Sequence, residues 1–218
     1  KVWNWQTGEE LRTLKGHTGA VNSVALSSGF AVSASDDQTL KVWNWQTGEE
    51  LRTLKGHTEA VCSVALSGDF AVSASDDQTL KMWNWQTGET LRTGKEHTEA
   101  VNSMILWNGV VVWASSKNIL KERDWRTGEE LPTSKWHFSA ISSVALWREF
   151  AVTPAVDGML NVWNWQTGET ITTFHAKSQQ TAVTIGTDAL IVVSGGRNGS
   201  VHFLCPNPAL MKVLQGSS

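Results

Sequence analysis

The feature that most constrains the fold of this chain is a repeat of 40 residues. Residues 1–40 and 41–80 differ at four positions, so 36 of 40 match. The unit continues with falling similarity through 81–120, 121–160 and 161–200, and a partial unit fills 201–218. Self-similarity at this period is typical of repeat architectures, in which each unit buries its apolar surface against its neighbours. We therefore predict one repeat domain over residues 1–218.

Each unit has the pattern of short strands and turns, without a helical period. In the first complete example, Val21–Ser27 and Phe30–Ser35 are apolar or small at successive positions. Thr39–Trp45 and Glu49–Lys55 follow, joined by a turn at Gln46–Gly48. Strands with two apolar faces are buried on both sides. The pattern predicts an all-β fold of four-stranded sheets that stack radially as the blades of a propeller.

The strand count predicts two N-terminal strands followed by five four-stranded blades, the last ending near Ala209–Gln215. The chain begins at Lys1, in the middle of a repeat and without Met. We therefore expect a fragment of a ring of about six to eight blades. Lys1–Lys15 would be a half blade with poor support, because the inner strands of its blade are missing. In the unit from residue 161, one inserted residue is expected before Ser194, which aligns with Ser33.

Composition excludes several classes of function. The net charge is −3, which gives no general attraction to nucleic acid or to an anionic membrane. Cys62 and Cys205 form no spacing motif for a metal or a disulfide framework, so no metal or cofactor is expected. The sequence has no segment apolar enough to cross a bilayer and does not open with a signal peptide. A cytoplasmic location is the default expectation.

The segments "GHT", "VNSVALS", "AVSASDDQTLKVWN" and "TGEELRTLKGH" occur in this order and repeat. They resemble the WD-repeat (WD-40) β-propeller family, and the resemblance covers nearly the whole chain. The Trp-Asp pair of that family reads Trp43-Asn44 here. The resemblance implies a rigid, non-catalytic platform for protein–protein interaction, often one module of a larger scaffolding, signalling or sensor protein.

The resemblance also implies a hydrogen-bonded network of His, Ser or Thr, Asp and Trp inside each blade. The matching residues are His17, Ser33 (or its neighbour Ser35), Asp37 and Trp43; His57, Ser73, Asp77 and Trp83; and His137, Thr153, Asp157 and Trp163. Such a network is physically reasonable, because a buried carboxylate needs donors and an imidazole N–H is one. The residue types are also those of a hydrolase triad. A triad needs an exposed nucleophile, an oxyanion hole and a single instance, so repetition favours a structural role.

One unit departs from this pattern. Trp113, Lys117 and Arg123 stand where the first unit has Ser33, Asp37 and Trp43, although His97 is retained. A Trp gained in one strand and lost from the next keeps the volume roughly constant. The change is either drift with compensation or a specialised blade that carries a binding site. In the last unit, Leu204, Asn198 and Ser178 align with Trp43, Asp37 and His17, so no network is expected there.

Irregular tryptophans are candidate anchors for a partner. Trp107 and Trp147 replace the Ser27 position and are expected, exposed and close together, on one rim; Trp136 replaces the Gly before His and is expected on the opposite rim. Exposed aromatic side chains are typical interface anchors, although these could instead fill gaps under loops. The tryptophans that recur in every unit are predicted to be packing residues: Trp5, Trp45, Trp85, Trp125 and Trp165.

The rim with the His and Asp turns also carries acidic residues. They are Asp36, Glu59, Asp76 and Glu99. Four carboxylates on adjacent blades would favour a basic protein or peptide partner, whereas the alternative is that they are solvated turn charges. A different class of function, a small-ligand or glycan-binding propeller, would use Trp-rich pockets between blades. An enzyme ranks third, because no single cluster of catalytic residues stands out.

Overall fold

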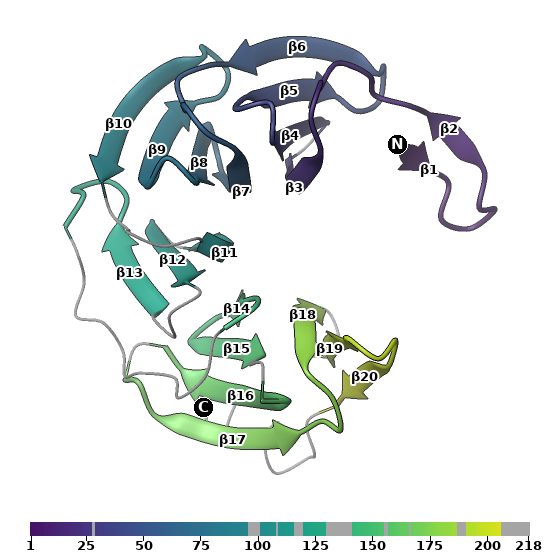
Figure 1. Ribbon diagram of the computed structural model, residues 1–218, viewed down its shortest axis with the longest axis vertical. Helices are drawn as coiled ribbons and strands as arrows, with labels where there is room; N and C mark the ends of the chain where they lie inside the picture. Colours follow the sequence, from purple (N-terminus) through teal and green to yellow (C-terminus); the bar gives the residue numbers. More distant parts are fainter. Residues whose placement is uncertain are drawn as a thin grey trace, which may run out of the picture. The chain divides into compact units, whose positions relative to one another are not determined.

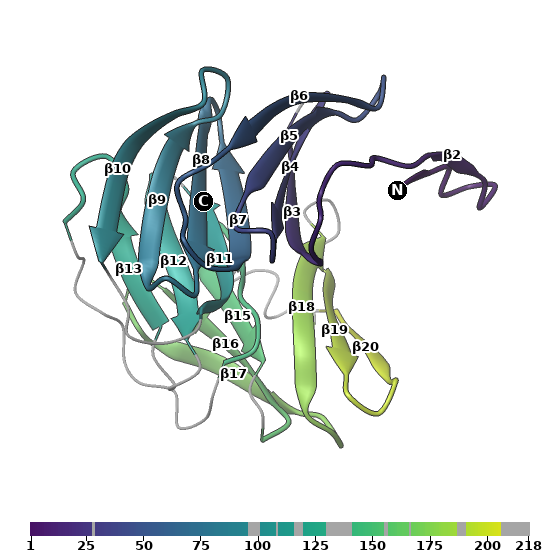
Figure 2. The same ribbon diagram turned by 45° about the horizontal axis from the view of Figure 1, so that its top comes forward.

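The structure is a computed structural model in which all described secondary structure is β. It describes residues 1–27, 29–95, 101–107, 109–115, 120–129, 141–154, 157–165, 167–186 and 191–205, except the side chains at 102, 107, 114, 115 and 120. Twenty strands form six antiparallel sheets over these residues (Figures 1 and 2). The chain divides into two compact units: Lys1–Trp113 with Glu122–Leu131, and Ala114–Lys121 with Pro132–Ser218.

The first unit holds a strand pair, two four-stranded sheets and most of a three-stranded sheet. The pair is β1 (Val2–Trp3) and β2 (Glu10–Arg12). The four-stranded sheets are β3 (Val21–Ser27), β4 (Phe30–Ser35), β5 (Leu40–Asn44) and β6 (Glu49–Leu54), and β7 (Val61–Ser67), β8 (Phe70–Ser75), β9 (Thr79–Asn84) and β10 (Glu89–Lys95). The three-stranded sheet is β11 (Val101–Trp107), β12 (Val110–Ser115) and β13 (Leu120–Asp124). Strand β7 lies beside both β3 and β11.

Near-identical repeats give the same strand register. Val24 pairs with Ser33 in the first four-stranded sheet, and Val64 pairs with Ser73 in the second. The turn before the outer strand is fixed by its Asn, because Asn44 Oδ1 accepts hydrogen bonds from the backbone N–H groups of Gln46 and Thr47. Gly48 then takes a φ of +87°, which a residue without a Cβ adopts readily.

The sheets of the first unit have two distinct faces, which we call the entry face and the exit face. The exit face of β3–β6 carries five buried residues: Val32, Ala34, Leu40, Val42 and Leu54. It packs on the entry face of β7–β10, which carries Val61, Val64, Ala71, Trp83 and Trp85. The exit face of β7–β10 packs in turn on residues of β11 and β12. Burial on both faces explains the continuous apolar pattern of the inner strands.

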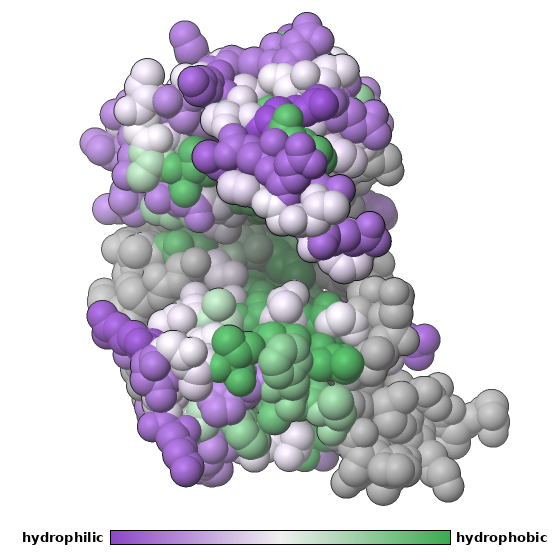
Figure 3. Space-filling model, turned by 90° about the vertical axis from the view of Figure 1, so that its right-hand side faces the viewer, coloured by the Kyte–Doolittle hydropathy of each residue, from purple (hydrophilic) through white to green (hydrophobic). Residues whose placement is uncertain are grey.

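The second unit contains a four-stranded and a three-stranded sheet. Their strands are β14 (Ala145–Trp147), β15 (Phe150–Pro154), β16 (Met159–Asn164) and β17 (Thr170–His175), and β18 (Gln180–Gly186), β19 (Ile191–Gly196) and β20 (Val201–Leu204). Strand β18 lies against β14 and β15. Hydrophobic side chains gather on one face of the β18–β20 sheet, at the bottom of Figure 3, where Val201 and Phe203 are exposed.

Register locates the insertion in the last unit. Val183 pairs with Ser194, as Val24 pairs with Ser33, whereas the turn from β18 to β19 is two residues longer than the turn from β3 to β4. One residue is missing before β18, so the net gain before Ser194 is one residue, as predicted. Counted back from β18, Ser178 stands at the Gly19 position rather than at the His17 position, yet its Oγ donates to Asn198 Oδ1 at 2.8 Å, as His17 contacts Asp37.

The fourth strands expected after β13 and β20 fall largely or wholly outside the described residues, so the number of blades stays a prediction. The expectation for the recurring tryptophans is wrong at one position. Trp85 and Trp165 are buried, but Trp5 is 88% exposed. Trp85 packs on Phe30 of the preceding sheet, with ring centroids 5.2 Å apart. Trp5 lies on the turn between β1 and β2.

Candidate functional site

The first candidate set joins three elements of the β3–β6 sheet. His17 precedes β3, Ser33 lies on β4, Asp37 lies in the turn after β4, and Trp43 lies on β5. His17 Nδ1 is 2.7 Å from Asp37 Oδ2, and His17 Nε2 is 2.7 Å from Ser33 Oγ. The Trp43 indole N–H donates to Ser33 Oγ at 2.8 Å. This chain of bonds is satisfied when His17 carries its proton on Nδ1 and Ser33 donates to Nε2.

The second set repeats the first almost atom for atom. His57 Nδ1 and Nε2 lie 2.8 Å from Asp77 Oδ2 and from Ser73 Oγ, and the Trp83 indole donates to Ser73 Oγ at 2.8 Å. Both sets are removed from solvent, because the His57 side chain is 0% exposed and the Asp77 side chain 7%. The geometry is therefore a property of the repeat unit.

The pKa of each aspartate lies well below its usual range, so both side chains stay ionised to a lower pH than an ordinary Asp. Burial alone would raise the pKa of Asp37, but its carboxylate accepts hydrogen bonds from Thr39, His17 and the backbone N–H of Thr18, and the net effect lowers its pKa. The pKa of Asp77 is lowered in the same way against its burial, by Thr79, the backbone N–H of Thr58 and His57. Hydrogen bonds to a charged form favour that form.

These sets have the Asp–His–Ser order of a hydrolase triad, but their serines are buried. Ser33 is 6% exposed, and Ser73 is fully buried. Each serine oxygen already accepts an indole N–H and lies within hydrogen-bond distance of the His Nε2. A nucleophile needs a free approach to substrate and a neighbouring oxyanion site. The arrangement instead locks His, Asp and Trp from separate strands into one rigid sheet.

The third candidate set is brought together in part. The Trp163 indole donates to Thr153 Oγ1 at 3.2 Å, and Thr153 is buried. Asp157 is exposed, and its Oδ1 accepts a hydrogen bond from the backbone N–H of Met159. His137 lies outside the described residues.

The β11–β13 sheet, whose sequence departs from the repeat pattern, has a different interior. Trp113, at the Ser33 position, is 1% exposed, and its indole N–H has no hydrogen-bond partner. Arg123, at the Trp43 position, donates from Nη1 to the carbonyl oxygen of Gly128 at 2.9 Å. His97 and Lys117 lie outside the described residues. A large side chain in the second strand thus replaces the large side chain of the third.

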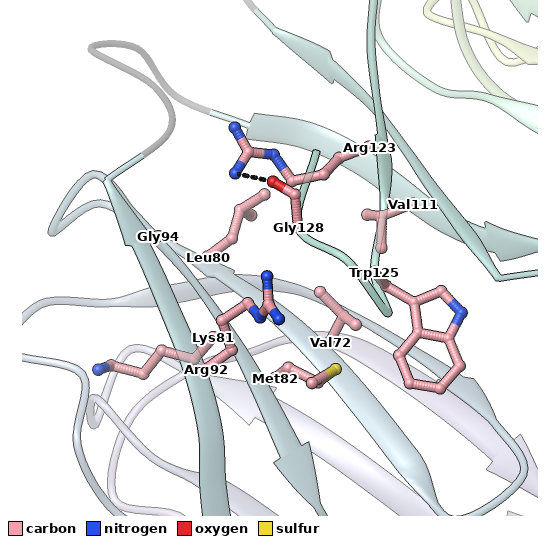
Figure 4. Close-up of a pocket in the computed structure, with 10 residues that line it drawn as sticks. All are labelled: Val72, Leu80, Lys81, Met82, Arg92, Gly94, Val111, Arg123, Trp125 and Gly128. Atoms are coloured by element: carbon pink, nitrogen blue, oxygen red, sulfur yellow. Dashed lines mark hydrogen bonds between the residues drawn. The ribbon is translucent and has the colours of Figure 1, made fainter. Parts of the chain in front are cut away.

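A small cleft, open to solvent, lies between the β7–β10 and β11–β13 sheets (Figure 4). Gly94 on β10 opens it, because the same repeat position in the preceding sheet holds the buried Leu54. The cleft lining combines apolar side chains with Trp125 and three cationic residues, Lys81, Arg92 and Arg123. Figure 4 shows the Lys81 side chain extending away from the apolar residues. Arg92 donates to the carbonyl oxygens of Arg126 and Thr127.

The acidic candidates of the first unit sit where the sequence pattern suggested. Asp36, Glu59 and Asp76 are exposed on turns beside the two networks. Asn22 donates to Asp36 Oδ1 at 2.7 Å and to the carbonyl oxygen of Val61 at 3.1 Å, which ties the Asp36 turn to the start of β7. Burial together with Asp76 and Asp36 raises the pKa of the Cys62 thiol to about 12. Glu99 lies outside the described residues.

Of the candidate aromatic anchors, only Trp147 has a described side chain. It is half-buried, lies over Phe150 at a centroid distance of 6.2 Å, and is covered by the guanidinium of Arg148 at 4.6 Å. Trp136 lies outside the described residues, as does the side chain of Trp107. The expected proximity of Trp107 and Trp147 therefore stays a prediction.

One buried polar group was not foreseen. Gln180 is fully buried in the last sheet, where it accepts from Ser194 Oγ at 2.9 Å and donates to the carbonyl oxygen of Ser178 at 2.8 Å. Ser194 occupies the Ser33 position, so Gln180 takes over the role of partner to this hydroxyl. The signal was a Gln at the start of a strand, at a position that is Val or Ile in the other units.

The described residues hold no group of three or more His, Cys, Asp or Glu side chains suited to a metal ion. Over the same part of the chain, no helix has the length and hydropathy that crossing a bilayer requires.

Comparison with known proteins agrees with this geometry. The family described as WD40, "WD domain, G-beta repeat", matches residues 8–44 and 48–84, which contain the two complete networks. No curated protein matches the chain. Among solved structures, the chain is similar to the computationally designed Ika4 protein, with a TM-score of 0.65 and 31% identity over 72% of this chain and 98% of that one. The chain belongs to the WD-repeat family and has its all-β fold.

Proposed function

We propose that the chain is a non-catalytic scaffold for protein–protein interaction, acting as the propeller module of a larger scaffolding, signalling or sensor protein. WD repeats generally mediate protein–protein interaction and are generally non-catalytic. The observation that carries the proposal is the closure of the His17 and His57 networks, in which each serine oxygen is buried and bound to an indole. The residues that resemble a catalytic site instead form hydrogen bonds that hold the sheets rigid.

A rigid scaffold needs a recognition surface, and the acidic turns of the first unit are the best supported one. Asp36, Glu59 and Asp76 are exposed on adjacent sheets, and Asn22 holds the Asp36 turn against the start of β7 in the next sheet. Fixed charges of one sign favour a partner of opposite charge and increase its association rate. The proposed partner is a basic protein or peptide.

The test is binding of a Lys- and Arg-rich peptide to the chain, measured by fluorescence anisotropy at several salt concentrations. The change of Asp36 and Asp76 to Asn together should weaken binding about tenfold at low salt, because two favourable charge pairs are lost. The matched control changes Glu49 and Glu89 to Gln, since these are exposed acids at the start of β6 and β10. Equal losses in both variants would mean that only net charge matters, and would contradict a site at these turns.

The cleft of Figure 4 favours a second candidate function, the binding of a small ligand or glycan. Trp125 offers an aromatic surface, and Arg92 and Arg123 lie beside apolar side chains. Small-molecule sites commonly combine these features. Gly94→Leu restores the residue of the preceding repeat and should fill the cleft. A glycan or other small ligand that binds the parent chain and the Gly94→Leu variant equally would exclude this cleft as its site.

A further inference from the structure

The interface between the β7–β10 and β11–β13 sheets differs from the preceding one at two positions. Leu54 and Trp83 are 1% and 0% exposed and belong to one apolar cluster between the β3–β6 and β7–β10 sheets. Their repeat positions in the next interface hold Gly94 and Arg123, and both of these residues line the cleft of Figure 4. One large apolar side chain is thus absent from the cleft, and another is replaced by a cation.

The floor of this cleft is apolar. It is lined by side chains from both sheets: Val72, Leu80, Met82 and Val111. Val72, Leu80 and Val111 are buried, so water in the cleft would find few hydrogen-bonding groups there. Apolar cavities in proteins take up apolar molecules of matching size. The absent residue is a leucine, which points to a branched aliphatic group of similar size.

Two guanidinium groups meet at one residue beside this floor. Arg92 packs against Gly128, where a Cβ would overlap its guanidinium. Its two Nη atoms donate to the carbonyl oxygens of Arg126 and Thr127. Arg123 donates from Nη1 to the carbonyl oxygen of Gly128 at 2.9 Å. No carboxylate among the described residues forms an ion pair with Arg92. Two positive charges so close together favour an anion beside them.

The aromatic side chain of the cleft is already in contact with other groups. Trp125 packs on Phe70 with ring centroids 4.6 Å apart, and the guanidinium of Arg126 lies over its ring at 5.6 Å. A sugar would need an aromatic face on which to stack, whereas an aliphatic chain needs only apolar contacts. The contacts of Trp125 therefore favour an aliphatic chain over a glycan.

We propose that the cleft binds a small branched aliphatic carboxylate, with the hydrocarbon beside Gly94 and the carboxylate at Arg92 and Arg123. The inference rests on the small-ligand function proposed for this cleft and names the class of its ligand. Pairs of guanidinium and carboxylate form charge-assisted hydrogen bonds of matching geometry. The preceding interface, with Leu54 and Trp83, provides neither the space nor the second cation.

The probe is isovalerate, which joins the isobutyl group of a leucine side chain to a carboxylate. It is titrated into the whole chain with isotope-labelled methionine methyl groups, and the signals are followed by NMR. The Met82 signal should shift and saturate, whereas that of Met159, in the second unit, should not move. Acetate and isoamyl alcohol each carry one half of the probe, and both should bind at least about tenfold more weakly.

Substitutions assign the two halves of the site. Arg92→Gln and Arg123→Gln should each weaken isovalerate binding about tenfold, because each removes one charged donor. Arg52→Gln is the matched control, since Arg52 lies against Gly88 at the same repeat position, and it should leave binding unchanged. Gly94→Leu should abolish binding, and it should raise the Tm of the free chain because it fills the space.

The three-ligand comparison needs only the parent chain, so it decides the question even if a variant fails to fold. The proposal is overturned if acetate or isoamyl alcohol binds as tightly as isovalerate, or if isovalerate causes no shift. Equal losses for Arg52→Gln, or unchanged binding to Gly94→Leu, also overturn it. A neutral glycan that shifts Met82 in the parent chain but not in Gly94→Leu would contradict the carboxylate while keeping the small-ligand function. Every one of these results leaves the recognition of basic peptides at the acidic turns untouched.

Discussion

A single aspartate in each network organises several donors at once. Asp37 accepts from His17, from both the backbone and the hydroxyl of Thr39, and from the backbone N–H of Thr18. Its side chain is 9% exposed, so these donors have little access to water. Loss of this carboxylate would therefore remove the common acceptor of several buried donors.

Asp37→Ala should lower the free energy of unfolding by about 2–4 kcal/mol, because it leaves a buried imidazole and several backbone donors without their acceptor. Asp157→Ala is the matched control, since Asp157 is exposed at the same repeat position. It should cost about 0.5 kcal/mol or less. Urea denaturation of the two variants measures both values, and equal costs would contradict the role assigned to Asp37.

The lowered pKa values of Asp37 and Asp77 predict a loss of stability in acid. Their folded-state pKa values lie below the ordinary value of 3.8, so their contribution is present above that value and is lost as the pH falls below it. Urea midpoints measured from pH 5 to pH 2, about the range over which these groups titrate, should therefore fall. Changing both residues to Asn should flatten this dependence, and an unchanged slope would assign the acid sensitivity to other carboxylates.

At the scale of one sheet, the β11–β13 sheet carries its large buried side chain on the second strand, where the β3–β6, β7–β10 and β14–β17 sheets carry it on the third. Trp113 and Arg123 hold the places of a Ser and a Trp, and Trp113 carries the buried bulk. Core volume is conserved more strictly than the identity of the residue that fills it. The exchange leaves an indole N–H without a partner, a cost that the other networks avoid.

A double-mutant cycle tests this exchange. Trp113→Ser alone should cost about 3–5 kcal/mol, because it leaves a cavity. With Arg123→Trp added, the indole can refill that cavity and donate to the new hydroxyl, so the double variant should be about 1–3 kcal/mol more stable than the sum of the two single changes. Additive costs would show that the two positions pack independently.

At the scale of the whole molecule, repetition determined how much could be predicted. The strands and the His17 and His57 networks were foreseen because their spacing recurs. Gln180 was missed because it occurs once, and the cleft was missed because it depends on a glycine where another repeat has leucine. The exposure of Trp5 could not be read from its sequence, since an identical residue is buried or exposed according to its neighbouring unit. The local sequence determines the strands of each sheet, whereas packing against the neighbouring repeat unit determines which side chains are buried.

This dependence on the neighbour gives a prediction for two equivalent valines. Val64→Ala should cost about 1.5–3 kcal/mol, because Val64 is packed between two sheets and its loss leaves a cavity. Val24→Ala, at the same repeat position, should cost about 0.5 kcal/mol or less, because most of its side chain already contacts water. Thermal and urea unfolding of the two variants give the comparison directly. If Val24→Ala were as costly as Val64→Ala, something would have to cover β3 in solution.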